Sequence, residues 1–176
     1  MNNGLYIKPS QDTLGDFMGT WLVDHISTRV RPTTLDGYRW RAKSTIDVLG
    51  HLRLCDLQPH HIQAYHRAKL DEGLSSATLV KHHNLLRSSL ANAVRWKLIE
   101  HNMAELVDPP RAWHKEMRAL TEEEANLLLD SCKETQWHPV LHTLIWTGLR
   151  RSEVLGLQWG DIDLDAAVLK VTRVLH

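Results

Sequence analysis

The adjacent prolines Pro109-Pro110 most constrain how this chain of 176 residues folds. A proline lacks a backbone N–H and clashes with the preceding helical turn, so two in succession cannot continue a helix. Before them, apolar residues recur at helical spacing; after them, a helical pattern gives way to a strand-like one. The sequence therefore predicts two units, residues 1–108 and 119–176, joined by a linker over residues 109–118.

The first unit contains four segments with the apolar spacing of amphipathic helices. They cover residues 13–27, 31–50, 57–73 and 75–100. In the second segment, Pro32 and a Thr33-x-x-Asp36 capping pattern predict the start of the helix, and Gly50 predicts its end. Four helices in about 90 residues favour a compact helical bundle.

The second unit begins with a helical pattern and ends with a strand-like one. Thr121-x-x-Glu124 is a capping box, a second apolar helix stops at Gly148, and residues 147–163 are expected to form a third. From Val168 the apolar period becomes two, which predicts a strand over residues 168–175. A lone strand leaves backbone groups unpaired. The predicted fold class is therefore mainly α, with a helical bundle followed by an incomplete α+β domain that ends at its first strand.

The composition excludes several classes of protein. No apolar run approaches the roughly 18–20 residues that cross a bilayer, and the N-terminus has no secretory pattern, so no membrane partner is expected. Cys55 and Cys132 lack CxxC spacing, which favours a reducing cytoplasm. Neither His60-His61 nor His82-His83 is completed by a cysteine or carboxylate at a familiar ligand spacing, so no metal site is predicted. Most of the scattered tryptophans are expected in the core or docked on the linker, with Trp159 fixing the turn after the helix that contains Arg150.

Charge is unevenly distributed although the formal net charge is zero. Residues 1–113 carry 14 Lys and Arg against 11 Asp and Glu, whereas the remainder carries 7 against 10. The fourth helix has a polar stripe opposite its leucines, and the second helix adds two cations one turn apart. The candidate contacts to DNA are Lys81, Asn84, Ser88, Asn92 and Arg95, with Arg39 and Lys43. Short polar side chains mixed with cations suit phosphate contacts, although charge patterning alone favours an ordinary solvated helix face.

Arg150 and Arg151 stand together in an apolar stretch, TGLRRSEVLGLQWGDID. On a helix from about residue 150, Arg150 would share a partly apolar side with Glu153, which could hold its guanidinium toward an anion such as phosphate. A bridge between Arg150 and Glu153 that only holds the fold is equally compatible with the pattern. Arg151 is expected to be solvated or to contact backbone.

The same stretch resembles the first active-site arginine motif of the tyrosine recombinases, the phage-integrase family. The matching residues are Thr147, Gly148, Arg150, Glu153, Leu157, Trp159, Asp161 and Ile162. The capped helix before it is similar to the opening of that family's catalytic domain. The helical region that precedes both is similar to its core-binding domain, which presents two such helices to DNA. The resemblance therefore favours DNA contacts over a solvated face for the candidate residues of the second and fourth helices.

The resemblance implies a reaction and roles for two residues. Arg150 would contact the scissile phosphate and Glu153 would support it, while a tyrosine attacks to form a 3′-phosphotyrosyl link on double-stranded DNA. No metal or nucleotide cofactor is implied, and the full-length protein is expected to oligomerise on DNA. The family's lysine, His-x-x-Arg and nucleophilic tyrosine follow the first arginine, but here Tyr6, Tyr38 and Tyr65 all precede it. This chain alone is therefore not expected to cleave DNA.

Three hypotheses follow from the sequence. The first is site-specific DNA recombination or integration by a phage or mobile-element recombinase, of which this chain is a DNA-binding and catalytically incomplete N-terminal portion. The second is a non-catalytic DNA-binding module that occupies recombination sites. The third is a helical interaction protein without affinity for DNA. Duplex binding that weakens steeply with salt separates the third hypothesis from the other two.

Overall fold

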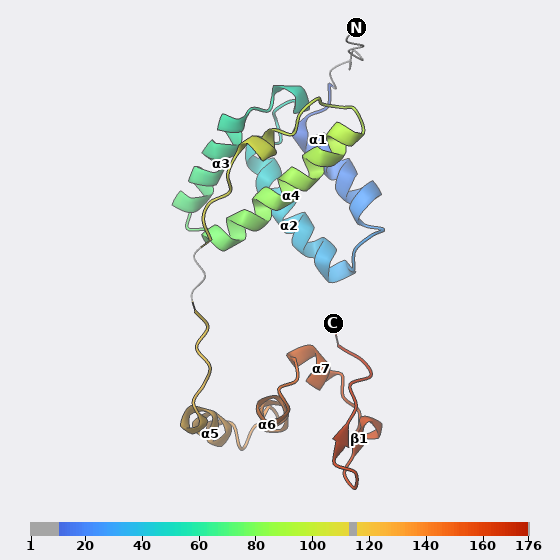
Figure 1. Cartoon of the computed structure of the whole chain (residues 1–176), viewed down its shortest axis with the longest axis vertical. Helices are drawn as coiled ribbons and strands as arrows, with labels where there is room; N and C mark the ends of the chain where they lie inside the picture. Colours follow the sequence, from blue (N-terminus) through green and yellow to red (C-terminus); the bar gives the residue numbers. More distant parts are fainter. Residues whose placement is uncertain (1–10, 113–115, 176) are drawn as a thin grey trace. The chain divides into compact units, whose positions relative to one another are not determined.

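The computed structural model describes residues 11–112 and 116–175. The chain divides between residues 115 and 116 into two compact units (Figure 1). The described residues do not include 113–115 of the predicted linker, and so leave out Trp113. They also leave out Tyr6 and His176. Within the described ranges no helix is both long and apolar enough to cross a membrane.

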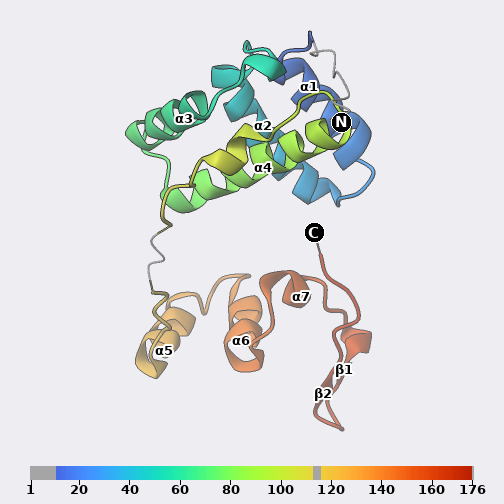
Figure 2. The ribbon, with the colours of Figure 1, turned by 45° about the horizontal axis from the view of Figure 1, so that its top comes forward.

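Four main helices build the first unit. They are α1 (Leu14–Thr20), which continues into a π-helical turn η1 (Trp21–Ile26), α2 (Pro32–Leu49), α3 (Pro59–Asp71) and α4 (Ser76–Arg95), with short 3-10 turns η2 (Leu54–Asp56) and η3 (Met103–Leu106). Helix α2 contacts α1, α3 and α4, and α4 also packs on α3 and η3 (Figures 1 and 2). The predicted mainly α class is confirmed.

The starts of these helices follow local capping chemistry, with one difference from expectation. The backbone N–H of Thr78 donates to Ser75 Oγ at 3.2 Å, which caps α4. Helix α2 instead begins at Pro32 after Arg31 and has no side-chain cap bond, so the predicted Thr33-x-x-Asp36 box is wrong. The fixed φ of Pro32 suits the first helical position, and the helix starts two residues earlier than the box requires.

The core of the first unit lies under one face of α4. Leu79, Leu86 and Leu90 are all at most 1% exposed and belong to one cluster with apolar residues of the other helices. The partners at the centre of this cluster include Leu14, Met18, Trp21, Leu57 and Ile62. Burying a leucine side chain stabilises a fold by about 1.5–3 kcal/mol, so the apolar stripe of α4 fixes how this helix is turned.

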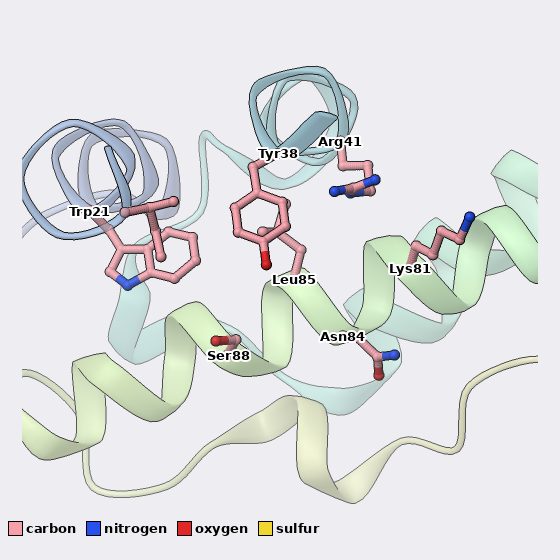
Figure 3. Close-up of a pocket in the computed structure, with 8 residues that line it drawn as sticks. Trp21, Tyr38, Arg41, Lys81, Asn84, Leu85 and Ser88 are labelled. Atoms are coloured by element: carbon pink, nitrogen blue, oxygen red, sulfur yellow. The ribbon is translucent and has the colours of Figure 1, made fainter. Parts of the chain in front are cut away.

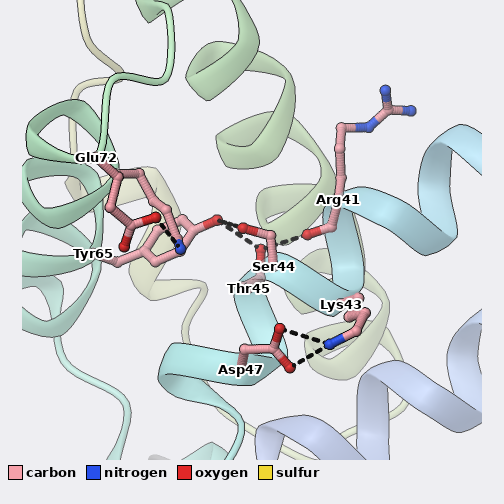
Figure 4. A network of polar contacts seen from close by, with 8 residues as sticks. Arg41, Lys43, Ser44, Thr45, Asp47, Tyr65 and Glu72 are labelled. Atoms are coloured by element: carbon pink, nitrogen blue, oxygen red, sulfur yellow. Dashed lines mark hydrogen bonds and ion pairs between the residues drawn. The ribbon is translucent and has the colours of Figure 1, made fainter.

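A polar link joins three helices inside this core. The hydroxyl of Tyr65 in α3 lies 2.7 Å from Nδ1 of His82 in α4 and 3.3 Å from Oγ1 of Thr45 in α2. Thr45 Oγ1 also donates to the carbonyl of Arg41 at 3.0 Å (Figure 4). All three side chains are buried, and a buried hydroxyl left without a partner would be costly. The link therefore favours one register of α2, α3 and α4.

The second unit contains short helices and a hairpin. Its elements are α5 (Glu122–Ser131), α6 (His138–Thr147), α7 (Arg151–Leu155), a 3-10 turn η4 (Trp159–Asp161), β1 (Ile162–Asp163) and β2 (Val168–Leu169). The predicted capping box is confirmed, because Thr121 N donates to Glu124 Oε2 at 2.9 Å and Glu124 N to Thr121 Oγ1 at 3.3 Å. Helix α6 stops as predicted at Gly148, whose φ of 66° is left-handed.

The predicted strand and third helix of this unit are both shorter than expected. The sheet begins at Ile162, which pairs antiparallel with Leu169, and only the first two residues of the expected strand 168–175 belong to it. The chain beyond returns to α7, where Leu175 N donates to the carbonyl of Ser152 at 2.9 Å. Alternating side chains indicate an extended backbone, but they do not say whether its partner is a strand or a helix end.

Most tryptophans lie outside the core, contrary to expectation. Trp21 is buried, but the other described tryptophans are exposed: Trp40, Trp96, Trp137, Trp146 and Trp159. Trp159 is 87% exposed and does not fix the turn that it begins. Among the described residues of the second unit, the buried large apolar side chains are Leu129 and Val154, which leaves little core in which an indole could be enclosed.

We expect Leu86→Ala to destabilise the first unit by about 2–5 kcal/mol, because it leaves a cavity beneath α4. Urea unfolding followed by circular dichroism measures this as a lower midpoint. Leu106→Ala is the matched control, since that leucine is 66% exposed and its truncation should shift the midpoint little. Equal shifts for the two variants would contradict the assigned core.

We expect the first unit to lose stability between pH 6.5 and about pH 4. Burial lowers the pKa of His66 and of His82 from 6.5 to about 4, and it also lowers the pKa of His83. In this window the unfolded chain binds protons that the folded chain does not, so stability is complete above pH 6.5 and falls as the pH drops.

Urea midpoints measured across this window test the expectation. The variant His66→Phe keeps a ring beside His83 and removes one of the three groups, so it should flatten the pH dependence. His101→Ala, at an exposed position, should leave the pH dependence unchanged. A wild-type urea midpoint that stays constant from pH 7 to about pH 4 would contradict the lowered pKa values of these buried histidines.

Candidate functional site

Arg150 lies at the junction between α6 and α7. It directly precedes α7 and has an extended backbone, φ −70° and ψ 150°. The sequence placed Arg150 inside the helix, whereas the structure places it just before the first helical residue. Its backbone N–H donates to Glu153 Oε2 at 2.8 Å, and its Nη1 donates to Glu153 Oε1 at 3.0 Å. The predicted pairing of Arg150 with Glu153 is confirmed. The left-handed turn at Gly148 provides the reversal that separates the two helices.

The Arg150 guanidinium is held at one edge and is otherwise open. The Arg150 side chain is 83% exposed, whereas that of Glu153 is 17% exposed. Arg150 therefore does not lie on the partly apolar face that the sequence predicted. The backbone hydrogen bond from Arg150, followed by its side-chain bond, lowers the pKa of Glu153. Because one carboxylate oxygen holds one of five N–H donors, the remaining donors can bind an anion. Arg151 is exposed, as expected.

Asp161 anchors the segment that follows the arginine motif. It accepts from Gln158 N at 2.9 Å, from Thr172 Oγ1 at 2.9 Å, and from both terminal nitrogens of Arg173 at 2.9 and 3.3 Å. The backbone bond from Gln158 is the main cause that lowers the pKa of Asp161, although its burial opposes this. Sequence reasoning matched Asp161 only as a motif residue. Its distance in sequence from Arg173 gave no sign of the clamp.

A cationic cleft lies between α2 and α4 in the first unit. It encloses about 390 Å³ and is lined by Trp21, Ile26, Tyr38, Arg41, Lys81, Asn84, Leu85 and Ser88 (Figure 3). Lys81, Asn84 and Ser88 are three of the predicted contacts, and each is exposed. They face the opening because Leu79, Leu86 and Leu90 occupy the opposite side of α4.

The cation that α2 contributes to this cleft differs from the prediction. Arg41 lines the opening, whereas Arg39 and Lys43 do not. Residues two positions apart on a helix point in nearly opposite directions, so Arg41 and its two neighbours of like charge cannot share one face. Arg39 Nη1 lies 3.4 Å from Asp36 Oδ1, and Lys43 Nζ lies 2.8 Å from Asp47 Oδ2. Both positive charges are therefore compensated by a carboxylate on the same helix.

The end of the predicted polar stripe also differs. Asn92 is 8% exposed, and its amide nitrogen donates to the carbonyl of Ser88 at 2.9 Å. Eleven residues separate Asn92 from Lys81, which is only about 20° around the helix, so the rotation of α4 does not account for the burial of Asn92. Arg95 is exposed at the end of α4 and remains available.

Histidines do not form a metal site in the described ranges. No group of three or more His, Cys, Asp or Glu side chains within these ranges is arranged to hold an ion. The ring of His61 instead accepts the backbone N–H of Gln58 at 3.1 Å and caps α3. His66, His82 and His83 are buried between helices.

Comparison with known proteins finds a family model and several relatives that match this chain. The family model for the phage integrase N-terminal SAM-like domain matches residues 13–70, which contain α1, α2 and all but the last residue of α3. A tyrosine recombinase XerC-like protein of Caldanaerobacter subterraneus is 27% identical over 183 residues, covering 99% of this chain and 47% of that protein. The integrase of Salmonella phage P22 is 33% identical over 93 residues, covering 52% of this chain and 23% of that protein.

This chain is similar to tyrosine recombinases and phage integrases. The arginine motif lies in the part of the chain that the C. subterraneus relative also covers, although the family model ends before α4. The chain spans about half the length of that curated relative.

Solved recombinase structures share the fold. A lambda integrase dimer bound to a COC′ core site superposes with a TM-score of 0.76 at 20% identity, covering 86% of this chain and 43% of that one. The Tn1549 transposon integrase, in complex with circular intermediate DNA, gives a TM-score of 0.76 at 19% identity and covers 93% of this chain and 55% of that one. At these identities the likeness is evidence for the fold alone.

We expect Asp161→Ala to release the segment that follows β2. The clamp to Arg173 and the bond from Gln158 would both be lost, so amide hydrogens at Gln158 and Leu175 should exchange faster with solvent. Hydrogen exchange read by mass spectrometry measures the change. Asp165→Ala, at an exposed position of the same hairpin, is the control. Unchanged exchange in the Asp161 variant would contradict the anchoring role.

Proposed function

We propose that this chain acts in site-specific DNA recombination, as the DNA-binding unit and part of the catalytic site of a phage or mobile-element tyrosine recombinase. The observation that carries the proposal is the cleft between α2 and α4, where Arg41 and Lys81 stand beside Asn84 and Ser88. Phosphate groups are the partners that such a mixture of cations and short hydrogen-bonding side chains suits best. Similarity to a phage integrase domain and to a tyrosine recombinase XerC-like protein supports DNA as the source of the phosphates.

Double-stranded DNA is the proposed substrate. The helical unit presents the exposed side of α4 over several turns, from Lys81 to Arg95, which suits contacts spaced along a duplex backbone. Solved structures of lambda integrase, which share this fold, are described as a dimer bound to a COC′ core site and as a tetramer bound to a Holliday junction. We therefore propose that the complete protein oligomerises on its site. The proposed place of action is the cytoplasm, in keeping with cysteines that lack CxxC spacing.

Arg150 is proposed to contact the scissile phosphate, with Glu153 as the residue that positions it. Glu153 holds both the backbone and the side chain of Arg150, so the guanidinium is oriented before an anion arrives. Preorganised donors stabilise charge that develops on a phosphate during reaction. No metal or nucleotide cofactor is part of this proposal.

A non-catalytic DNA-binding module is the second candidate. It is favoured by the positions of the described tyrosines, because Tyr38 and Tyr65 both belong to the first unit, and Tyr65 is buried with its hydroxyl bonded to His82. A nicked suicide duplex tests the second candidate, which requires binding without a covalent protein–DNA adduct. Both candidates lead us to expect no adduct from this chain of 176 residues, so only a positive result discriminates. A phosphotyrosyl adduct would show that it is catalytically competent.

We expect the double variant Lys81→Ala/Arg95→Ala to bind duplex DNA more weakly and with a flatter salt dependence. Each lost phosphate contact reduces the slope of log K against log salt by about 0.9, so the slope should fall by nearly 2. Fluorescence anisotropy with a labelled random-sequence duplex measures both quantities. The control is Arg39→Ala/Lys43→Ala, which removes the same charge from cations already paired with carboxylates. Equal slopes for the two double variants would refute the α4 face.

A further inference from the structure

The cation that α2 places in the cleft is held differently from the other cations of that helix. Arg39 and Lys43 lie against Asp36 and Asp47, respectively. Arg41 has no ion pair with a carboxylate of the described ranges, and its Cζ lies 5.1 Å from the ring centroid of Tyr38. Figure 3 shows both side chains projecting from α2 toward the opening that Lys81 and Asn84 line from α4.

The backbone of α2 leaves room for this arrangement. Gly37 lies one turn before Arg41, and a Cβ added there would be 3.4 Å from Arg41 Nη2 and 3.5 Å from Nη1. The guanidinium therefore folds back over a position that has no side chain and rests near the Tyr38 ring. This places the arginine along its own helix instead of leaving it fully extended into solvent.

An aromatic ring and a carboxylate hold an arginine in different ways. A carboxylate occupies N–H donors and cancels the positive charge, whereas a ring contacts the flat face of the guanidinium and leaves its five N–H donors at the edge. An arginine restrained by a ring thus keeps its full charge and its fork of donors for a phosphate. Restraint before binding also reduces the side-chain entropy that binding must overcome.

We propose that Arg41 binds a DNA phosphate in this cleft and that Tyr38 is the positioning residue that holds it there. Tyr38 acts through Arg41 and its ring, and its hydroxyl is not required. The inference rests on the proposed DNA-binding function and adds to it two residues of α2 that the polar pattern did not indicate. Lys81 then faces the same phosphate region from α4.

Five variants of the full chain test the proposal by anisotropy titration of a labelled random-sequence duplex over a series of salt concentrations. They are Arg41→Ala, Tyr38→Leu, Tyr38→Phe, the double variant Tyr38→Leu/Arg41→Ala, and the control Lys43→Ala. Arg41→Ala should reduce the salt slope by about 0.9, as one lost phosphate contact requires. Tyr38→Leu should weaken binding about two- to fivefold, the range expected for a cation–π contact.

The remaining variants distinguish positioning from a structural effect. Tyr38→Phe keeps the ring and should restore wild-type affinity. Tyr38→Leu should cause no further loss when Arg41 is already alanine, because its effect passes through that arginine. Lys43→Ala should bind nearly as the wild type does. Circular dichroism and the urea midpoint of each variant establish that the helices are retained, and the double variant remains informative if Tyr38→Leu is only partly destabilised.

Each contrary outcome has a separate meaning. Wild-type binding without salt dependence would overturn both the proposed function and this inference. A normal loss in Lys81→Ala/Arg95→Ala with unchanged binding in Tyr38→Leu would overturn only the inference. The inference also fails if Tyr38→Phe binds as weakly as Tyr38→Leu, or if the effects of Tyr38→Leu and Arg41→Ala simply add.

Discussion

The burial of one face of α4 is the constraint on which the first unit depends. Leu79, Leu86 and Leu90 must all lie in the core, and together they fix the rotation of a 20-residue helix. Once that rotation is set, Lys81 and Asn84 have to lie on the exposed side of α4, where they line the cleft together with residues of α2. The candidate binding surface is therefore a consequence of the core: the same spacing that buries the leucines exposes the polar residues between them. The buried link from Tyr65 to His82 adds directional specificity to this packing, which apolar contacts alone do not have.

Much of the fold could be predicted because the helices of the first unit have strong local signals. Apolar periodicity located α1 to α4. Gly50 and Gly148 correctly marked the ends of α2 and α6. The second unit was harder because its elements are short and its contacts are distant in sequence. Alternation at residues 168–175 predicted a strand, but only two residues pair as a strand and the chain beyond them returns to α7. Pattern alone cannot identify that partner, since both arrangements present the same alternating side chains.

The candidate site could be predicted only where local sequence determined the contact. Arg150 and Glu153 are three residues apart, so their pairing follows from spacing. The choice among the cations of α2 required the rotation of that helix against α4, which charge patterning does not contain. Arg39 and Lys43 have carboxylates three or four residues away and pair with them, so Arg41 is left to line the cleft. Asn92 illustrates the same limit, because a polar residue near a helix seam can be enclosed when its amide finds a backbone carbonyl.

Three arginines in this chain are held in three ways, and the manner of holding determines what each can do. Asp161 binds both terminal nitrogens of Arg173, which turns a cation into a clamp between the hairpin and the chain beyond it. Glu153 contacts Arg150 through one guanidinium nitrogen and leaves the rest exposed, so this arginine is oriented and still able to bind an anion. Tyr38 restrains Arg41 without taking any N–H donor, which preserves the largest capacity for phosphate. The second and third arrangements combine order with available charge, and that combination is what recognition of a phosphate backbone requires.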